Sequence, residues 1–135
     1  MTDYQPPRLL EPVDDLDGFT CRSDEQTNWL RRHARQSATT GTTRVVVVTP
    51  VTPHRSRDVV AYYAWCMAQI DVESAPPRLR KGAGRYPQPV ALLARLGVHV
   101  NHEGCGLGAG LLADAVTRLV GISEDIGCRG LLIHA

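Results

Sequence analysis

The sequence predicts an α/β domain of the α+β type, in which helices flank a mixed central sheet. A valine-rich run at 44–49 and a β-branched and aromatic run at 59–70, separated by a turn, predict an antiparallel hairpin. The order strand, glycine-rich loop, helix and strand over 90–134 predicts a βαβ unit, which adds a parallel pair. With 135 residues, 43% of them hydrophobic, the chain suits one domain with its own core.

The other elements are predicted from caps and periodicity. Asp24 is a suitable N-cap for a helix that runs to about Ser37. The strand of the βαβ unit covers 90–100, and its helix covers 107–125. The apolar face of that helix carries Leu111, Leu112, Ala115, Leu119 and Ile122. The last strand is expected at 129–135.

Charge divides the chain unevenly although its net charge is only +1. Residues 1–18 form an acidic lead-in, expected to be loose or to lie at a sheet edge, and 19–135 form the domain proper. No acid occurs between Glu73 and Glu103, and arginine supplies nearly all of the basic residues. A guanidinium binds phosphate in a bidentate manner, so the arginines favour a phosphate-bearing ligand. A compositional bias of a GC-rich genome explains them equally well.

Several classes of protein are disfavoured. No stretch of about 18 apolar residues indicates a membrane span, and the N-terminus shows no apolar signal core, so we expect a cytoplasmic protein. The four cysteines lack CxxC spacing, which is typical of reduced thiols. His99, His102 and Cys105 have metal-like spacing, but no fourth ligand is near in sequence, so no metal is expected.

The loop at 103–109 carries the most functional information. Its glycines let the backbone approach an anion closely, and the following helix adds free N–H groups and the positive end of its dipole. These features predict a cradle for a pyrophosphate. No Gly-Lys-Ser/Thr follows, which excludes the Walker loop, and the GxGxxA form fits the dinucleotide fingerprint poorly. The alternative is that the glycines only allow close packing of a helix on a sheet.

Residues 92–112 resemble motif A of the GCN5-related N-acetyltransferases, a hydrophobic strand followed by Gln/Arg-x-x-Gly-x-Gly/Ala and a helix. Glu103 stands at the Gln/Arg position, where it brings a negative charge, and Gly106 and Gly108 are the two small positions. Further segments are similar, in the same order, to the acetyltransferase toxins of bacterial toxin–antitoxin modules: 19–23 (Phe-Thr-Cys-Arg-Ser), 28–34 with its Trp-Leu-Arg-Arg, 60–64 with its paired tyrosines, 78–81 (Arg-Leu-Arg-Lys) and 85–90.

This resemblance implies a GNAT fold and an enzyme that uses acetyl-CoA to acetylate the amino group of aminoacyl-tRNA, which blocks translation. It also implies a homodimer and a neutralising antitoxin of the ribbon-helix-helix type. Acetyl-CoA is expected on backbone groups of Leu96, Gly97, Val98, Glu103, Gly104, Cys105, Gly106, Leu107, Gly108 and Ala109. The tRNA is expected on Arg31, Arg35, Arg78, Arg80, Lys81 and Arg85, although the helical arginines also fit an ordinary solvated face.

The chemistry requires a neutral amine, a donor to the thioester oxygen and a proton for the leaving thiolate. A strand N–H near Val98 is expected to supply the donor. In the family a tyrosine after the next strand supplies the proton, and that segment is expected beyond Ala135, together with the last two strands. No catalytic residue is therefore assigned within the chain. Two alternatives remain, namely a truncated, non-catalytic module that binds CoA or a partner, and an acetyltransferase for a small amine or protein.

Overall fold

The computed structural model describes residues 3–70, 88–126 and 130–133. In these residues a five-stranded sheet has the order β1-β2-β3-β4-β5, in which only the β4–β5 pair is parallel. The elements are β1 (Arg8–Leu9), α1 (Asp24–Arg32), α2 (Ala34–Thr40), β2 (Arg44–Val48), β3 (Ala61–Ile70), β4 (Gln88–Val98), α4 (Leu107–Ile126) and β5 (Leu131–Ile133), with short 3₁₀ turns at Pro53–Arg55 and Val100–His102. The mixed sheet, the hairpin and the βαβ unit are confirmed.

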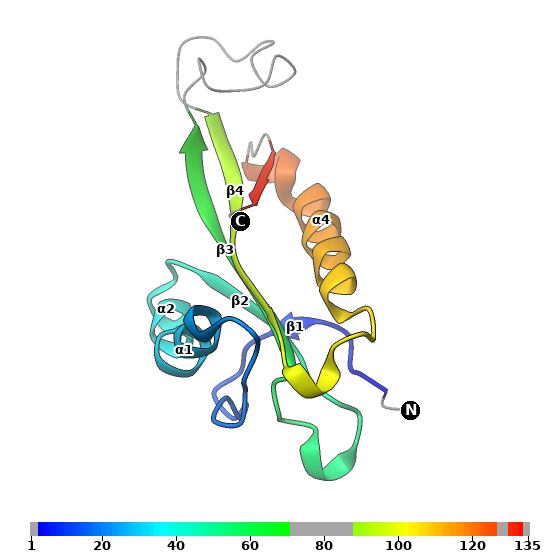
Figure 1. Cartoon of the computed structure of the whole chain (residues 1–135). Helices are drawn as coiled ribbons and strands as arrows, with labels where there is room; N and C mark the ends of the chain where they lie inside the picture. The colour runs from blue at the N-terminus through cyan, green and yellow to red at the C-terminus, as the bar shows by residue number, and fades with distance from the viewer. Residues whose placement is uncertain (1–2, 71–87, 127–129, 134–135) are drawn as a thin grey trace.

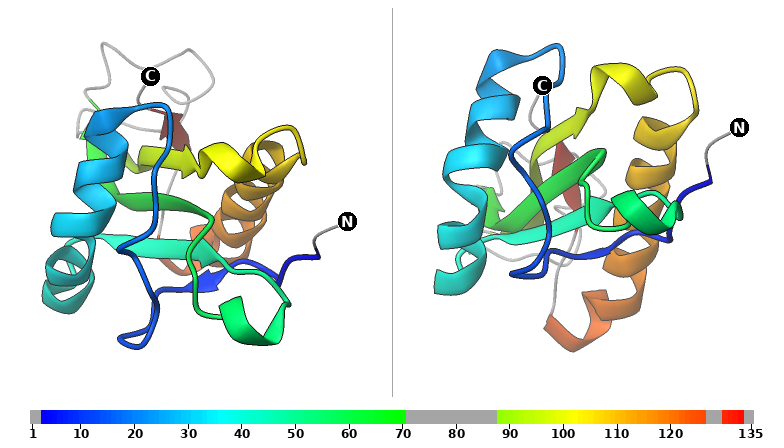
Figure 2. Two further views of the ribbon diagram at one scale, coloured as in Figure 1. Left: turned by 60° about the horizontal axis from the view of Figure 1, so that its bottom comes forward. Right: turned by 90° about the horizontal axis from the view of Figure 1, so that it is seen from below.

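The sheet lies between two helical layers, with α1 and α2 on one face and α4 on the other (Figures 1 and 2). Alternation along β2 sorts its side chains, because successive residues of a strand point to opposite faces. Val46 and Val48 join the core under α4, which includes Leu111, whereas Val45 and Val47 join the core under α1 and α2. The chain therefore builds two apolar cores on one sheet.

A bulge interrupts β4 in its middle. Ala64 of β3 pairs with Arg95, and the next residue, Trp65, pairs with Leu93, so Ala94 has no partner across the pair. The extra residue shifts the alternation: Leu93 before the bulge and Leu96 after it both face the α4 side. One strand thus packs apolar side chains under α4 on both sides of the bulge.

The helices differ from the sequence prediction in two details. The first helix begins after Ser23, whose hydroxyl accepts the Gln26 N–H, and it is interrupted at His33 rather than running to Ser37. In α4, Leu111 is buried but Leu112 and Ile122 are substantially exposed. The i, i+4 row that contacts the sheet is Leu107, Leu111, Ala115 and Leu119, and Leu112 lies about 100° away from it around the helix.

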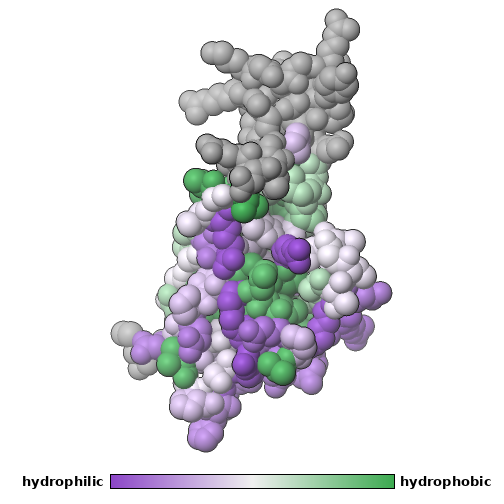
Figure 3. Space-filling view, turned by 180° about the vertical axis from the view of Figure 1, so that it is seen from behind, coloured by the Kyte–Doolittle hydropathy of each residue, from purple (hydrophilic) through white to green (hydrophobic). Residues whose placement is uncertain are grey.

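Apolar side chains also reach the surface. Seen from behind, an apolar region lies between hydrophilic flanks (Figure 3). The larger exposed apolar side chains of α4 are Leu112, Val116, Val120 and Ile122.

None of the helices in the described part of the chain is long and apolar enough to cross a membrane.

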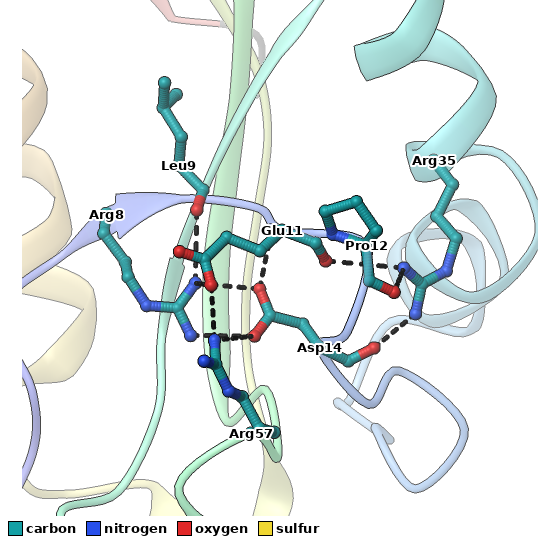
Figure 4. A network of polar contacts seen from close by, with 7 residues as sticks. All are labelled: Arg8, Leu9, Glu11, Pro12, Asp14, Arg35 and Arg57. Carbon is teal, nitrogen blue, oxygen red and sulfur yellow. Dashed lines mark hydrogen bonds and ion pairs between the residues drawn. The ribbon is translucent and has the colours of Figure 1, made fainter.

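The acidic lead-in is folded onto the sheet as its edge, so the prediction of an edge segment is confirmed. β1 pairs with β2, and the buried Asp14 carboxylate receives two hydrogen bonds of 2.8 Å from Arg8 (Figure 4). The Glu11 N–H also donates to Asp14, and Arg57 lies 3.6 Å away. Burial raises the pKa of Asp14, but the Arg8 and Glu11 hydrogen bonds and the charge of Arg57 outweigh it and leave the pKa lowered.

Candidate functional site

The open edge of β4 presents backbone groups beyond the bulge. Over the described residues β5 pairs with β4 only at 91–93. The His99 N–H donates to the Val60 carbonyl on the β3 side, at 2.8 Å. Because alternate residues of an antiparallel strand point toward the partner strand, the N–H and C=O groups of Leu96 and Val98 point away from β3. Among the described residues these groups have no strand partner, so this edge offers donors and acceptors to an extended ligand.

Gly97 belongs to the same strand but has a different role. A Cβ at this position would lie 3.0 Å from Tyr62 Cε1, and 3.3 Å from both Cys21 Sγ and Phe19 Cζ. All three neighbours are buried under the α1 layer. The glycine therefore allows the core under α1 to pack against β4. Of the three strand residues expected at the cofactor, only Leu96 and Val98 point their backbone N–H and C=O groups toward the open edge.

The glycine loop leads directly into α4. Gly104 and Gly106 have φ of +77° and +81°, values that side chains strongly disfavour. Gly108 allows the first turn to approach β4, with its would-be Cβ 3.9 Å from Val98 Cγ2. The first intrahelical hydrogen bond runs from the Gly110 N–H to the Gly106 carbonyl, at 2.9 Å. The N–H groups of the three residues before Gly110 therefore have no acceptor within the helix. The loop and helix therefore have the shape of an anion cradle.

Glu103 stands at the entrance to this loop with its charge paired. Arg22 Nε lies 2.8 Å and 3.0 Å from the two carboxylate oxygens. The Arg22 side chain is 83% exposed and that of Glu103 is 31% exposed, so the pair lies at the surface. Sequence reasoning missed Arg22, because 81 residues separate it from Glu103 and no local pattern joins them.

The other polar residues of this region hold the loop in place. The Tyr4 hydroxyl lies 2.8 Å from His102 Nδ1 and also contacts Cys105 Sγ at 3.7 Å. His99 Nδ1 accepts the Asn101 N–H, which leaves Nε2 to donate to the Gly18 carbonyl at 3.0 Å. Burial, with smaller contributions from His99 and Arg55, lowers the pKa of His102. In the described residues no cluster of three metal-ligating side chains occurs.

The expected nucleic-acid residues fall into three groups. Arg31 is exposed on α1. Arg35 is also on the surface, but its guanidinium donates to the carbonyl oxygens of Pro12, at 2.9 Å, and of Asp14 (Figure 4). It therefore ties α2 to the lead-in. The expected residues Arg78, Arg80, Lys81 and Arg85 lie outside the described residues.

Trp29 and Arg95 form a further contact that the sequence did not indicate. The Arg95 guanidinium carbon lies 5.2 Å from the centroid of the Trp29 ring, which in turn stacks on Tyr62. Arg95 follows the bulged residue of β4, so the bulge turns its side chain toward α1. A cation over an aromatic face stabilises such a contact and here links α1 to β4.

The two tyrosines of β3 are fully buried on opposite faces of the sheet. Tyr62 donates to the Gln26 carbonyl at 2.7 Å, and Tyr63 donates to Asp114 Oδ2 at 2.7 Å. Burial is the main cause that strongly raises the pKa of both hydroxyls. They connect the sheet to α1 and α4.

A cavity away from this loop has a mostly apolar lining. Its volume is about 500 Å³, and its lining includes Trp65, Met67, Ala91 and Ile122. Ile122 belongs to the C-terminal half of α4, whereas the glycine loop precedes the N-terminus of that helix. Thr42 and Arg44 add polar groups to this lining, but the cavity does not include the glycine loop. The open edge of β4 with the loop at 103–109 is therefore the candidate site.

Comparisons with known proteins find relatives of this chain among bacterial toxins. The chain is 34% identical over all of its 135 residues to the tRNA-acetylating toxin of Mycobacterium tuberculosis, and it covers 78% of that protein. It is 28% identical over 131 residues to the probable toxin TacT of Sinorhizobium fredii, of which it covers 71%. A scan against protein-family models finds no match.

Solved structures show the same fold. The chain superposes on AtaT in complex with acetyl-methionyl-tRNAfMet with a TM-score of 0.86 and 24% identity, covering 98% of this chain and 78% of AtaT. A mutant AtaT bound to acetyl-CoA and to the C-terminus of the antitoxin AtaR gives a TM-score of 0.79 at 24% identity, covering 98% and 76%. The chain therefore belongs to the tRNA-acetylating toxins, the GCN5-related acetyltransferase toxins of bacterial toxin–antitoxin modules.

Proposed function

We propose that this chain is an acetyltransferase toxin that transfers the acetyl group of acetyl-CoA to the amino group of an aminoacyl-tRNA and thereby blocks translation. The observation that carries the proposal is the 34% identity with the tRNA-acetylating toxin, over an alignment of all 135 residues that includes the strand and glycine loop of the candidate site. AtaT, which has the same fold, is known in complex with an acetylated aminoacyl-tRNA.

The backbone of the candidate site suits acetyl-CoA, which supplies an activated acetyl thioester. The glycine loop and the first turn of α4, over 103–109, would hold the diphosphate through N–H groups and the helix dipole. The outward backbone groups of Leu96 and Val98 would pair with the amide arm. The Val98 N–H is the donor that we assign to the thioester oxygen, because such a donor stabilises the charge that grows there.

The acetyl acceptor is the amino group of an aminoacyl-tRNA, which must be neutral when it reaches this edge. The tRNA that carries this amine is a polyanion. Arg31 on α1 and the basic residues at 78–85 are the side chains that we assign to the tRNA, because guanidinium and ammonium groups provide most of the affinity for phosphates. Arg35 donates hydrogen bonds to the lead-in and so has a structural role. We therefore expect Arg35 to contribute less to tRNA affinity than Arg31.

The proposal extends to partners. AtaT binds the C-terminus of an antitoxin, and we expect this chain to be neutralised by a cognate antitoxin as well. We infer that the antitoxin carries a ribbon-helix-helix domain and that the toxin forms a homodimer, both from the resemblance of the toxin segments. Charged tRNA is a cytoplasmic substrate, so we propose that this toxin acts in the cytoplasm.

The test is acetylation of charged tRNA by the 135-residue chain. Aminoacyl-tRNAs are incubated with acetyl-CoA and the protein, then digested with a nuclease that releases aminoacyl-adenosine for mass spectrometry. We expect one added acetyl group on the amine of at least one aminoacyl-adenosine, formed slowly because no proton donor for the leaving thiolate is assigned among the 135 residues, and none with desulfo-CoA. Acetylation of small amines or peptides with no product on any charged tRNA would refute the proposal.

A further inference from the structure

The glycine loop carries a carboxylate at the place where its ligand would bring negative charge. Glu103 immediately precedes Gly104, and α4 begins four residues after Glu103, at Leu107. A fixed negative charge at this position repels a diphosphate and competes with it for the positive end of the helix. The loop therefore needs a way to neutralise Glu103.

Arg22 supplies the opposite charge from a segment far away in the sequence. Its Nε contacts both oxygens of the Glu103 carboxylate, at 2.8 Å and 3.0 Å. The hydrogen bonds with Glu103 are the main cause that raises the pKa of Arg22. Its remaining guanidinium N–H groups have no partner among the described residues, so they stay available to solvent.

The backbone holds Arg22 beside the loop. The Val100 N–H donates to the Thr20 carbonyl at 2.9 Å, which ties the segment before Arg22 to the turn before Glu103. The Cys21 N–H donates to Thr27 Oγ1 at 2.9 Å, which ties the same segment to α1. These two hydrogen bonds hold the backbone before Arg22 close to the loop that carries Glu103.

Resting on the proposed function, we propose that Arg22 is a positioning residue of the acetyl-CoA site, which holds the Glu103 carboxylate in an ion pair and so neutralises its charge beside the phosphate-binding N–H groups. The loop accepts the CoA diphosphate while this ion pair is formed. Without Arg22, the unpaired carboxylate opposes the ligand. When both charges are removed, the affinity of the loop for the diphosphate depends on its backbone N–H groups.

The exposure of the pair separates this role from a structural one. With the Arg22 side chain 83% exposed, the ion pair contributes little to folding, as exposed pairs generally do. Replacing Arg22 should therefore weaken ligand binding and leave the thermal midpoint unchanged. A residue needed only for the fold would lower the midpoint as well.

The experiment measures acetyl-CoA binding by calorimetry for the wild-type chain and for Arg22→Ala, Glu103→Gln and the double variant. Arg32→Ala is the matched control, because it removes the same charge from an exposed position on α1 that forms no ion pair with any described residue. At low salt we expect Arg22→Ala to weaken binding by about three- to tenfold, whereas Arg32→Ala binds like the wild type. Glu103→Gln should bind at least as tightly as the wild type.

The double variant decides the mechanism. If Arg22 acts by neutralising Glu103, the double variant recovers the affinity of Glu103→Gln to within about twofold. If it fails to recover, Arg22 contacts the phosphates directly and the proposal is overturned. An Arg22→Ala variant that binds like the wild type also overturns it. Failure of the wild-type chain to bind acetyl-CoA would instead refute the proposed function on which the inference rests.

Discussion

Replacing Gly97 with alanine tests whether β4 depends on close packing behind its open edge. The added Cβ would lie 3.0 Å from Tyr62 Cε1, whereas carbon atoms pack best at about 3.5–4.0 Å. Phe19 Cζ and Cys21 Sγ, both at 3.3 Å, close the other directions. Because all three neighbours are buried, none can move aside into solvent. We expect Gly97→Ala to lower the free energy of unfolding by about 1–3 kcal/mol, the usual cost of overpacking.

The assay is urea denaturation followed by tryptophan fluorescence. The matched control is Gly121→Ala in α4, where an added Cβ would meet nothing within 4 Å. Alanine at that helical position should stabilise the fold by about 0.5–1 kcal/mol. A Gly97→Ala variant as stable as the wild type would refute the packing argument, and would return Gly97 to a purely cofactor-binding role.

The remaining predictions concern the polar networks. Arg8→Ala leaves the buried Asp14 carboxylate with only the Glu11 N–H and Arg57 at 3.6 Å, so urea denaturation should show a loss of about 3 kcal/mol. The fold lowers the pKa of Asp14, so the stability that it contributes is present above its unfolded pKa and is lost as the pH falls through its folded pKa. The penalty of Arg8→Ala should accordingly shrink in acid, and a penalty independent of pH would contradict this account. Tyr63→Phe removes the hydrogen bond to Asp114 and should cost about 1 kcal/mol in the same assay, and no change would show that this bond contributes nothing.

Local patterns were sufficient to predict most of the elements. The valine run of β2, the long apolar run of β3 and the glycine loop before α4 each carry a signal within a few residues. The boundary of α1 was displaced because Ser23, one residue before the predicted Asp24, makes the capping hydrogen bond. Helical periodicity places Leu112 and Ile122 on the apolar face of the helix, but α4 contacts the sheet through a narrower row and leaves both of them exposed.

The features that the sequence could not provide all depend on long-range contacts. The bulge at Ala94 is visible only when β4 is paired with β3. In the sequence Arg35 and Arg31 are both basic residues of one predicted helix, but the Arg35 guanidinium donates to backbone carbonyls of the lead-in. The Arg22–Glu103 pair joins two segments that approach each other only after the sheet has formed. Basic residues could therefore be recognised, but not divided into structural and ligand-binding ones.

The central claim is that acetyl-CoA lies along the outer edge of β4 with its diphosphate on the loop at 103–109. Hydrogen exchange of the 135-residue chain with and without acetyl-CoA tests it at the level of single amides. We predict slower exchange on binding at Leu96, Val98 and the amides of 104–109, which have outward or unpaired N–H groups. Binding without protection there, or protection confined to the apolar cavity around Trp65, would contradict the account.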